Sequence, residues 1–278
     1  MTKRAALFLC VLLFAIPLRA QSNFFERWEA RTSATQSKQP AWPPPLATLF
    51  PGLIQVARTD FSRQISSTHA TTWNYGTSKG VNLIPWANTE IDINLPPYLE
   101  HSSPSSLDGA GDMSFLVKYR ALAGGNERGN YVVSFCFPFS IPTGSHKNGS
   151  TNASVSPTFA AGKGFGRFNL QSTLGATLPT GNTIKLGRPI AWNTTAQYHL
   201  GKYLWPELEA NATYFHGGPN DGRNQVFLTP GLLAGKFSLR PGEPRSRLGL
   251  SFGAGEQIAT SRFHAYNHNL IVTARLLF

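Results

Sequence analysis

The chain has 278 residues, of which 14% are charged and 12% aromatic, with 26 glycines and a mean hydropathy of −0.18. This length suits one large domain or two small ones, and the low hydropathy excludes a helical membrane protein. The formal net charge of +11 comes from basic residues scattered along the chain, which argues against nucleic-acid binding.

The N-terminal segment has the three parts of a secretory signal peptide. Lys3 and Arg4 precede an apolar run over residues 5–18, and Ala20 follows. This pattern predicts export, with cleavage after Ala20 and a signal peptide over residues 1–20. A transmembrane anchor is the alternative, which the short run disfavours. No later segment offers about 20 consecutive apolar residues.

Export leaves a single cysteine, Cys136, so no intrachain disulfide is expected. The mature chain carries 22 basic and 14 acidic residues, a net charge of +8. Residues 21–50 follow as an irregular, proline-rich leader, expected on the periplasmic side, with a short helix around residues 24–31.

From residue 51 to residue 278 the sequence alternates between apolar and polar residues, which is the signature of β-strands. In residues 131–141 one face is Tyr, Val, Phe, Phe, Phe and Ile, while the other is Val, Ser, Cys, Pro and Ser. A soluble β-sandwich also alternates, but its wet face usually carries Lys and Glu. Here the polar face is mostly uncharged and the segments are about 10–12 residues long, against about 5–6 in soluble strands. The pattern therefore favours an all-β fold, an antiparallel up-and-down transmembrane barrel with apolar residues outside.

Twelve strands are predicted, although counts of ten or fourteen remain open. Connections after even strands are mostly short and those after odd strands mostly longer, as in bacterial barrels; a longer connection after the weak second strand is the exception. The predicted strands cover residues 53–65, 70–76, 88–97, 111–122, 130–142, 153–161, 166–178, 190–200, 204–216, 224–237, 246–259 and 267–278.

The last predicted strand runs to Phe278 with one purely apolar face. In a barrel this strand pairs with the first and leaves no free edge. Phe278 lies in its lipid-facing register, and it resembles the terminal aromatic signal by which outer-membrane proteins are recognised for assembly. We therefore expect Phe278 to act as an assembly signal.

Three motifs resemble a family of bacterial outer-membrane transporters named for the MetA pathway of phenol degradation. They are Gly-Ala-Gly-Asp at residues 109–112 leading into Phe-Leu-Val-Lys-Tyr at 115–119, Ile-Pro-Thr-Gly at 141–144 and Leu-Pro-Thr-Gly at 178–181. The resemblance covers roughly residues 80–278. It implies a barrel of about twelve strands and passage of small compounds, hydrophobic or aromatic ones among them.

Polar residues on the inward face are the candidate lumen lining. Asp112 is expected to pair with Lys118, with Arg120 or with a neighbouring strand, as a structural ion pair or as a determinant of ion selectivity. The full set is Asp112, Lys118, Arg120, Gln171, Asn193, Gln197, His199, Glu207, Glu209 and Arg275.

Catalytic and metal-binding readings are weaker. The stretch Ser-His-Lys-Asn-Gly-Ser at residues 145–150 resembles the His-x-Ser-Asn-Gly motif of barrel phospholipases and lipid A deacylases, but Lys147-Asn148 replaces the serine position. Glu207 and Glu209 fit a lumen network better than an acid/base pair. Three histidines at 216, 264 and 268 lack a nearby carboxylate or cysteine that would suggest a metal site. We therefore expect no catalytic residue, metal or cofactor.

These observations predict a porin-like channel in the bacterial outer membrane that lets small solutes pass. Its expected partners are outer-membrane lipid, the barrel assembly machinery and those solutes, and not nucleic acid. A closed structural or adhesive barrel is the alternative, and a lipid-modifying enzyme is a weaker one. Whether the leader plugs the lumen is left open.

Overall fold

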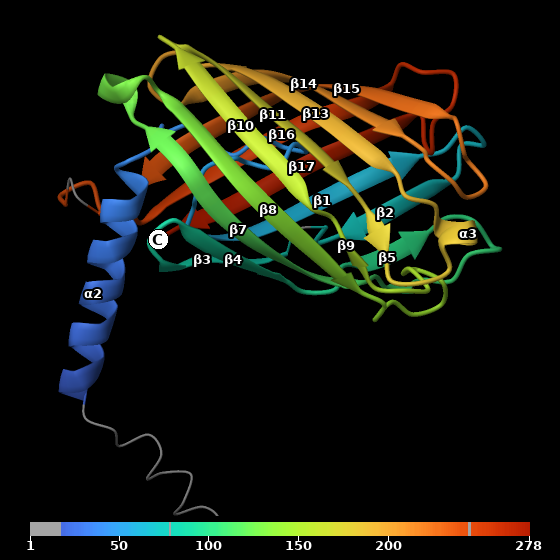
Figure 1. The fold of residues 1–278 in the computed structure, drawn as a ribbon, viewed down its shortest axis with the longest axis horizontal. Helices are drawn as coiled ribbons and strands as arrows, with labels where there is room; N and C mark the ends of the chain where they lie inside the picture. The colour runs from blue at the N-terminus through green and yellow to red at the C-terminus, as the bar shows by residue number, and fades with distance from the viewer. Residues whose placement is uncertain (1–17, 78, 244–245) are drawn as a thin grey trace, which may run out of the picture.

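The computed structural model describes residues 18–77, 79–243 and 246–278, and most of them form a closed antiparallel β-barrel (Figure 1). Seventeen β-segments belong to one sheet. They make twelve crossings of the wall, because five crossings each consist of two segments in line. The predicted signal peptide, residues 1–20, lies almost wholly outside the described residues.

The segments follow one another around the wall in chain order. They are β1 (Val56–Ile65), β2 and β3 (Thr71–Tyr75, Gly80–Trp86), β4 and β5 (Thr89–Asn94, Tyr98–His101), β6 and β7 (Gly109–Ala110, Met113–Gly124), β8 (Tyr131–Ile141), β9 and β10 (Ser154–Val155, Thr158–Phe165), β11 and β12 (Phe168–Ala176, Leu178–Pro179), β13 (Ile190–Tyr198), β14 (Leu204–Tyr214), β15 (Asn224–Ser238), β16 (Gly249–Ala259) and β17 (His268–Leu277). Two short helices, η1 (Asn126–Arg128) and α3 (Thr183–Leu186), lie in connections.

The barrel closes where its first and last strands meet. β1 pairs antiparallel with β17 over its whole length, from Val56 opposite Leu277 to Ile65 opposite His268. The expected closure, and the count of twelve, are confirmed. Closure provides hydrogen-bond partners for the backbone groups of both edge strands, which a sheet needs in order to span a lipid bilayer.

The second crossing is longer than predicted. Residues 80–86, expected as a connection, form β3, which continues the line of β2 and pairs with β1 and β4. The alternation breaks between them because Gly76 adopts a positive φ of 100°, a conformation that glycine tolerates. The connection to the third crossing is then only Ala87–Asn88, so the expected exception to the short-turn rule was wrong.

The two ends of the barrel differ in their connections. One end carries the connections 87–88, 125–130, 166–167, 199–203 and 239–248, together with helix α2 (Leu18–Gln36) and the end of β17. We call it the α2 end (Figure 1, left). The opposite end, the loop end, carries the connections 66–70, 102–108, 142–153, 180–189 and 215–223, and also 260–267.

The wall has the inside-out polarity of a membrane barrel. Outward side chains are large, apolar and exposed, for example Phe135, Phe137 and Trp192. Their neighbours in sequence point inward and are polar and buried, for example Ser134 and Thr195. Such an exterior suits lipid and not water, so the soluble sandwich is excluded.

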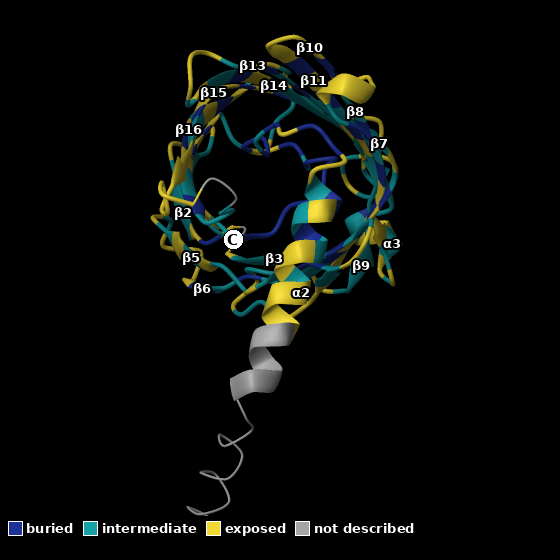
Figure 2. Cartoon of the chain, turned by 90° about the vertical axis from the view of Figure 1, so that its left-hand side faces the viewer, coloured by how far each residue is buried: buried dark blue, intermediate teal, exposed yellow. Residues whose placement is uncertain are grey.

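A segment of the leader lies inside the barrel. Helix α2, expected only around residues 24–31, extends to Gln36 and ends shortly before Pro40, which cannot continue a helix. No helix among the described residues is long and apolar enough to cross a membrane. Residues 37–55, the inner loop, then run irregularly through the lumen, where most of them are buried (Figure 2).

The inner loop enters and leaves the lumen through the α2 end. It starts at α2 and ends at Val56, which opens β1 at that same end. Its neck is held together by Gln39, whose Nε2 donates to the Leu53 carbonyl at 2.8 Å, while the Leu53 backbone N–H donates back to Gln39 Oε1 at 2.9 Å. The inner loop is therefore a closed excursion into the lumen and not a strand threaded through it.

Candidate functional site

Two glutamates of the wall bind the middle of the inner loop. Glu207 and Glu209, both on β14 and both buried, accept backbone N–H groups of Leu46, Ala47 and Thr48 at 3.1, 2.8 and 2.6 Å. The loop has no secondary structure to satisfy these donors, so the wall must do it. A buried backbone N–H that is left without an acceptor is costly, so these contacts favour the observed path of the loop.

An arginine on the last strand, Arg275, binds the prolines that directly precede Leu46. The Arg275 guanidinium donates to the carbonyl oxygens of Pro44 and Pro45, the latter at 2.8 Å, and Gln197 Nε2 donates to the Pro43 carbonyl at 3.2 Å. Proline has a carbonyl but no N–H. A run of three prolines therefore calls for donors from the wall, and the residues after it call for acceptors.

A buried ion pair holds the returning half of the loop. Lys118 Nζ lies 2.6 Å from Glu90 Oε1 and donates to the Gly52 carbonyl at 3.0 Å, while Glu90 also accepts the backbone N–H of Ile54. Both side chains are almost fully buried. Nearer the neck, Arg120 donates to Gln39 Oε1 at 2.8 Å.

Glycines of the wall make room for Leu46, the side chain at the middle of the inner loop. A Cβ on Gly231 would lie 2.5 Å from Leu46 Cδ1, and one on Gly255 would lie 2.6 Å from the same atom. A Cβ on Gly253 would lie 3.0 Å from Leu46 Cδ2. These distances are shorter than a carbon–carbon contact allows, so the wall is shaped to the loop.

Trp42 lies in a similar glycine-lined recess on the inner face of β10. A Cβ on Gly162 would lie 2.7 Å from the Trp42 ring, and one on Gly164 would lie 2.8 Å from it. Trp42 is buried and packs with Phe50 in one hydrophobic cluster of the lumen. Two anchoring side chains of the inner loop thus fit glycine-lined recesses.

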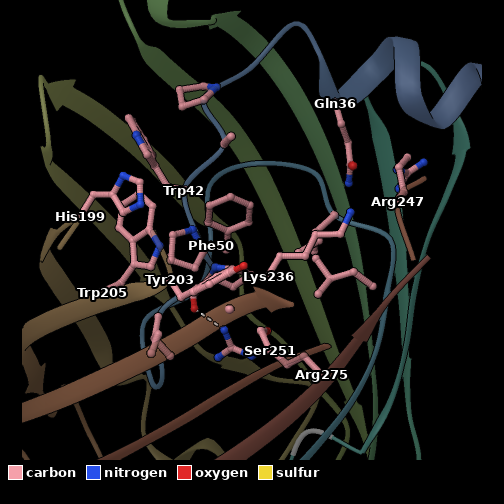
Figure 3. A pocket seen from close by; sticks show the side chains of 18 of the residues that line it. Gln36, Trp42, Phe50, His199, Tyr203, Trp205, Lys236, Arg247, Ser251 and Arg275 are labelled. Atoms are coloured by element: carbon pink, nitrogen blue, oxygen red, sulfur yellow. Dashed lines mark hydrogen bonds between the residues drawn. The ribbon is translucent and has the colours of Figure 1, made fainter. Parts of the chain in front are cut away.

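The inner loop separates two cavities. One, of about 460 Å³, lies at the α2 end between the loop and residues from β14 to β17 (Figure 3). The other, of about 470 Å³, reaches toward the loop end and is lined by polar side chains such as Gln64, Asn74 and Asn269. Both are bounded by Pro44, Phe50, Ile54 and Arg275. These four residues form the partition between the cavities.

Of the predicted lumen residues, the three amides on β11 and β13 form part of an inward polar network. Gln171 Nε2 donates to Asn169 and Gln197, each at 2.9 Å, and Gln197 donates on to Glu207 at 2.8 Å. Asn193 donates to a neighbouring threonine at 3.3 Å. His199 instead borders the α2-end cavity, where its ring stacks on Trp205 at 4.1 Å.

Asp112 does not make the expected pair with Lys118 or Arg120. Its carboxylate accepts the backbone N–H groups of Gly144 and Ser150 at 2.9 and 2.6 Å, and so holds the connection 142–153 at the loop end. Asp112 precedes β7 and therefore lies beyond the strand that carries the two basic residues. Glu90 takes the place beside Lys118.

Phe278 follows the end of β17 instead of lying in the strand. Its backbone N–H donates to the Gln55 carbonyl at 3.4 Å, and its backbone oxygen accepts from Arg247 at 2.9 Å. The ring lines a hollow shared with Phe24 and Trp28 of α2. The lipid-facing row of β17 thus ends at Leu276, and Phe278 lines the hollow beside α2.

The residues weighed for catalysis or metal binding have other contacts. Ser145 Oγ accepts the backbone N–H of Ala110, and His264 bonds to Ser261 and Asn267 within its own connection. His268 lies 3.1 Å from the exposed Glu256. Among the described residues no group of three metal-ligating side chains comes together.

Sequence reasoning missed the contacts of the inner loop. Glu90 was not singled out, although Thr-Glu-Ile-Asp-Ile-Asn at residues 89–94 places two acids on the inward face. Arg58 was missed as well; it forms a bidentate pair with Asp60 and donates to the Leu46 carbonyl at 3.0 Å. The inward glycines on β15 and β16 were a further available signal, since small residues facing inward imply something to accommodate.

Comparisons with known proteins agree with this architecture. A family model described as "Putative MetA-pathway of phenol degradation" matches residues 53–262. An outer membrane channel from Pseudomonas putida F1 is 12% identical with a TM-score of 0.55, over 85% of this chain and 100% of that one. At this identity the likeness shows the fold alone. A comparison with curated proteins gives no match.

Two further solved structures are less similar. The translocator domain of the autotransporter NalP from Neisseria meningitidis is 13% identical over 96% of this chain and 99% of that one, with a TM-score of 0.47. Outer membrane phospholipase A from Escherichia coli is 12% identical over 83% and 98%, with a TM-score of 0.37.

Proposed function

Because the chain belongs to the family named for the MetA pathway of phenol degradation, we propose that it is a channel of the bacterial outer membrane for small solutes, hydrophobic or aromatic ones among them. The observation that carries this proposal is the polar lumen with a cavity on each side of a non-covalently held loop. A purely structural barrel could fill its interior with wall side chains, as eight-stranded barrels do. Here space remains at both ends.

We further propose that the inner loop closes the channel. Irregular backbone at membrane depth is tolerated where protein buries it or where it lines a cavity. Because the loop enters and leaves through the α2 end, it can withdraw without passing its own chain through the barrel. Bacterial barrels place their short turns in the periplasm, so the α2 end faces the periplasm and the loop is withdrawn to that side.

Single-channel conductance in a planar bilayer tests the proposal. The intact chain is compared with a variant lacking residues 21–50, and with one in which residues 40–50 are replaced by a Gly–Ser linker of equal length. The second variant keeps Gln39 and Leu53, and with them the neck. We expect little conductance from the intact chain and steady conductance from both variants.

Other outcomes favour the other functions. Silence in all three forms, from protein shown to be folded by its gel mobility before and after heating, would contradict a channel and favour a closed structural or adhesive barrel. Lipid hydrolysis by the purified protein, abolished by His146→Ala, would favour an enzyme. Equal conductance with and without the loop would support a channel but refute the proposal that the inner loop closes it.

A further inference from the structure

The cavity at the α2 end has one aromatic side, which two separate segments of the chain build (Figure 3). The inner loop contributes Trp42 and Phe50, and the barrel wall contributes Tyr203 and Trp205. Figure 3 shows these rings gathered on one side of the pocket. Flat π surfaces from two separate segments suit a flat aromatic ring, which stacks offset or edge-on against them. A volume of about 460 Å³ is within the usual range of small-molecule sites.

The same cavity is strongly basic. Its lining includes Lys202, Lys236, Arg247 and Arg275, and among the described residues it includes no Asp or Glu. Figure 3 shows Arg247 and Arg275 across the pocket from the Trp42 ring. Glu29 of α2 acts electrostatically on Arg247 but is not part of the lining. The residues that line the cavity therefore carry positive charge only, and the carboxylates that act on them lie outside the lining.

Two of these cations have bonding capacity left for a ligand. Arg275 is committed to the proline carbonyls, and Lys202 lies in an exposed turn. Arg247 Nη2 donates to the Phe278 backbone oxygen, but Nη1 is buried without a hydrogen-bond partner. Lys236 Nζ has only a long contact of 3.4 Å to the Ser246 carbonyl. A buried donor without an acceptor is costly unless a ligand or water satisfies it.

Arg247 keeps its charge at neutral pH. Burial lowers the pKa of its guanidinium to about 10, and Glu29 opposes that shift. Its unpartnered Nη1 can donate a charge-assisted hydrogen bond to a carboxylate. The aromatic side of the cavity selects a ring, and the cations select an anionic group on it.

We propose that this cavity binds a small aromatic carboxylate, with benzoate as the simplest member of the class. The ring lies against the aromatic side of the cavity, and the carboxylate lies toward Arg247 and Lys236. The inference rests on the proposed channel, because it names the solute class that the channel holds. It is independent of conductance, since binding is measured directly.

Isothermal titration calorimetry on the intact, folded chain in detergent tests this site. The probes are benzoate, benzyl alcohol, which has the ring without the charge, and acetate, which has the charge without the ring. We expect benzoate to bind at least about tenfold more tightly than either. Its affinity should fall with ionic strength, because the attraction between charges is screened by salt.

Variants assign the two parts of the site. Arg247→Gln combined with Lys236→Gln should weaken benzoate binding about tenfold and leave benzyl alcohol unchanged, and Lys236→Gln alone should have a smaller effect. Trp205→Leu should weaken both ring-containing probes. The matched control is Lys163→Gln, an exposed lysine at the same end that bonds to Gly129 and lies outside the cavity.

The outcomes separate the site from the channel. Benzyl alcohol binding as tightly as benzoate, or the double variant keeping full benzoate affinity, would overturn the aromatic carboxylate site. Conductance without benzoate binding would refute the site and leave the channel standing. Benzoate binding with no conductance from any variant would refute the channel and leave the site standing.

Discussion

A single methyl group added to the wall should shift the inner loop from its bound toward its withdrawn state. In Gly231→Ala the new Cβ lies 2.5 Å from Leu46 Cδ1, well inside the contact distance of about 3.5–4.0 Å. The other nearest atoms, Glu207 Cγ at 3.3 Å and the Ala254 carbonyl at 3.4 Å, need little or no movement. The clash therefore falls mainly on the loop and spares the barrel wall.

Overpacking of this kind costs about 1–3 kcal/mol. Applied to the equilibrium between the bound and the withdrawn loop, that corresponds to a shift of about 5- to 150-fold. Gly231→Ala should raise both the open probability of the channel and the rate at which a protease cuts the loop between α2 and β1. The matched control is Gly242→Ala in a connection at the α2 end, where an added Cβ meets nothing within 4 Å.

A second substitution tests the assigned cause. Leu46→Ala removes the atom that the new methyl group meets, so Leu46→Ala should suppress part of the effect of Gly231→Ala. The interaction energy from the double-mutant cycle should be of opposite sign to the effect of either single change. The reasoning fails if Gly231→Ala behaves like the natural chain, or if the two substitutions simply add.

Three further predictions test the wall, the buried ion pair and the end of the chain. Leu174→Lys, on the lipid face, should lower the free energy of unfolding by about 2–4 kcal/mol near the midplane, whereas Gln64→Lys, facing the loop-end cavity, should be tolerated. Urea titrations in lipid compare the two variants. A larger loss for Gln64→Lys would mean that the lipid and lumen faces are assigned the wrong way round. Lys118→Met leaves Glu90 buried and unpaired, so it should lower the free energy of unfolding by about 3–5 kcal/mol in the same titration. Adding Glu90→Gln should recover part of that loss. No recovery in the double variant would argue that the ion pair does not stabilise the barrel. Phe278→Ala should lower the amount of folded protein in the outer membrane, and an unchanged yield on a heat-shift gel would count against its role in assembly.

Most of the barrel could be predicted because strand alternation is a local property of the sequence. Tyr131–Ile141 reads as one lipid face and one lumen face without knowledge of any neighbour. β3 was missed because Gly76 interrupts the alternation within one crossing, so that a bend inside a strand looked like the start of a loop.

The candidate site was harder to predict because its contacts are remote in sequence. The inward direction of Glu207, Glu209 and Arg275 follows from alternation, but their partners lie about 160 to 230 residues earlier. Proline-rich segments without periodicity usually indicate solvated linkers. Only the lumen, which forms when the sheet closes, gives residues 43–48 their partners.

The position of Arg275 ties the inner loop to the seam of the barrel. β17 pairs with β1 to complete the wall, and the same strand supplies the guanidinium that holds Pro44 and Pro45. These contacts join residues more than 200 positions apart, so they belong to the slow, non-local part of folding. A partly folded chain whose sheet ends at β16 has neither a closed wall nor the contacts of Arg275 with the prolines. Pairing of β17 with β1 provides both, so the barrel acquires its enclosed lumen and the hydrogen bonds to the prolines in one step.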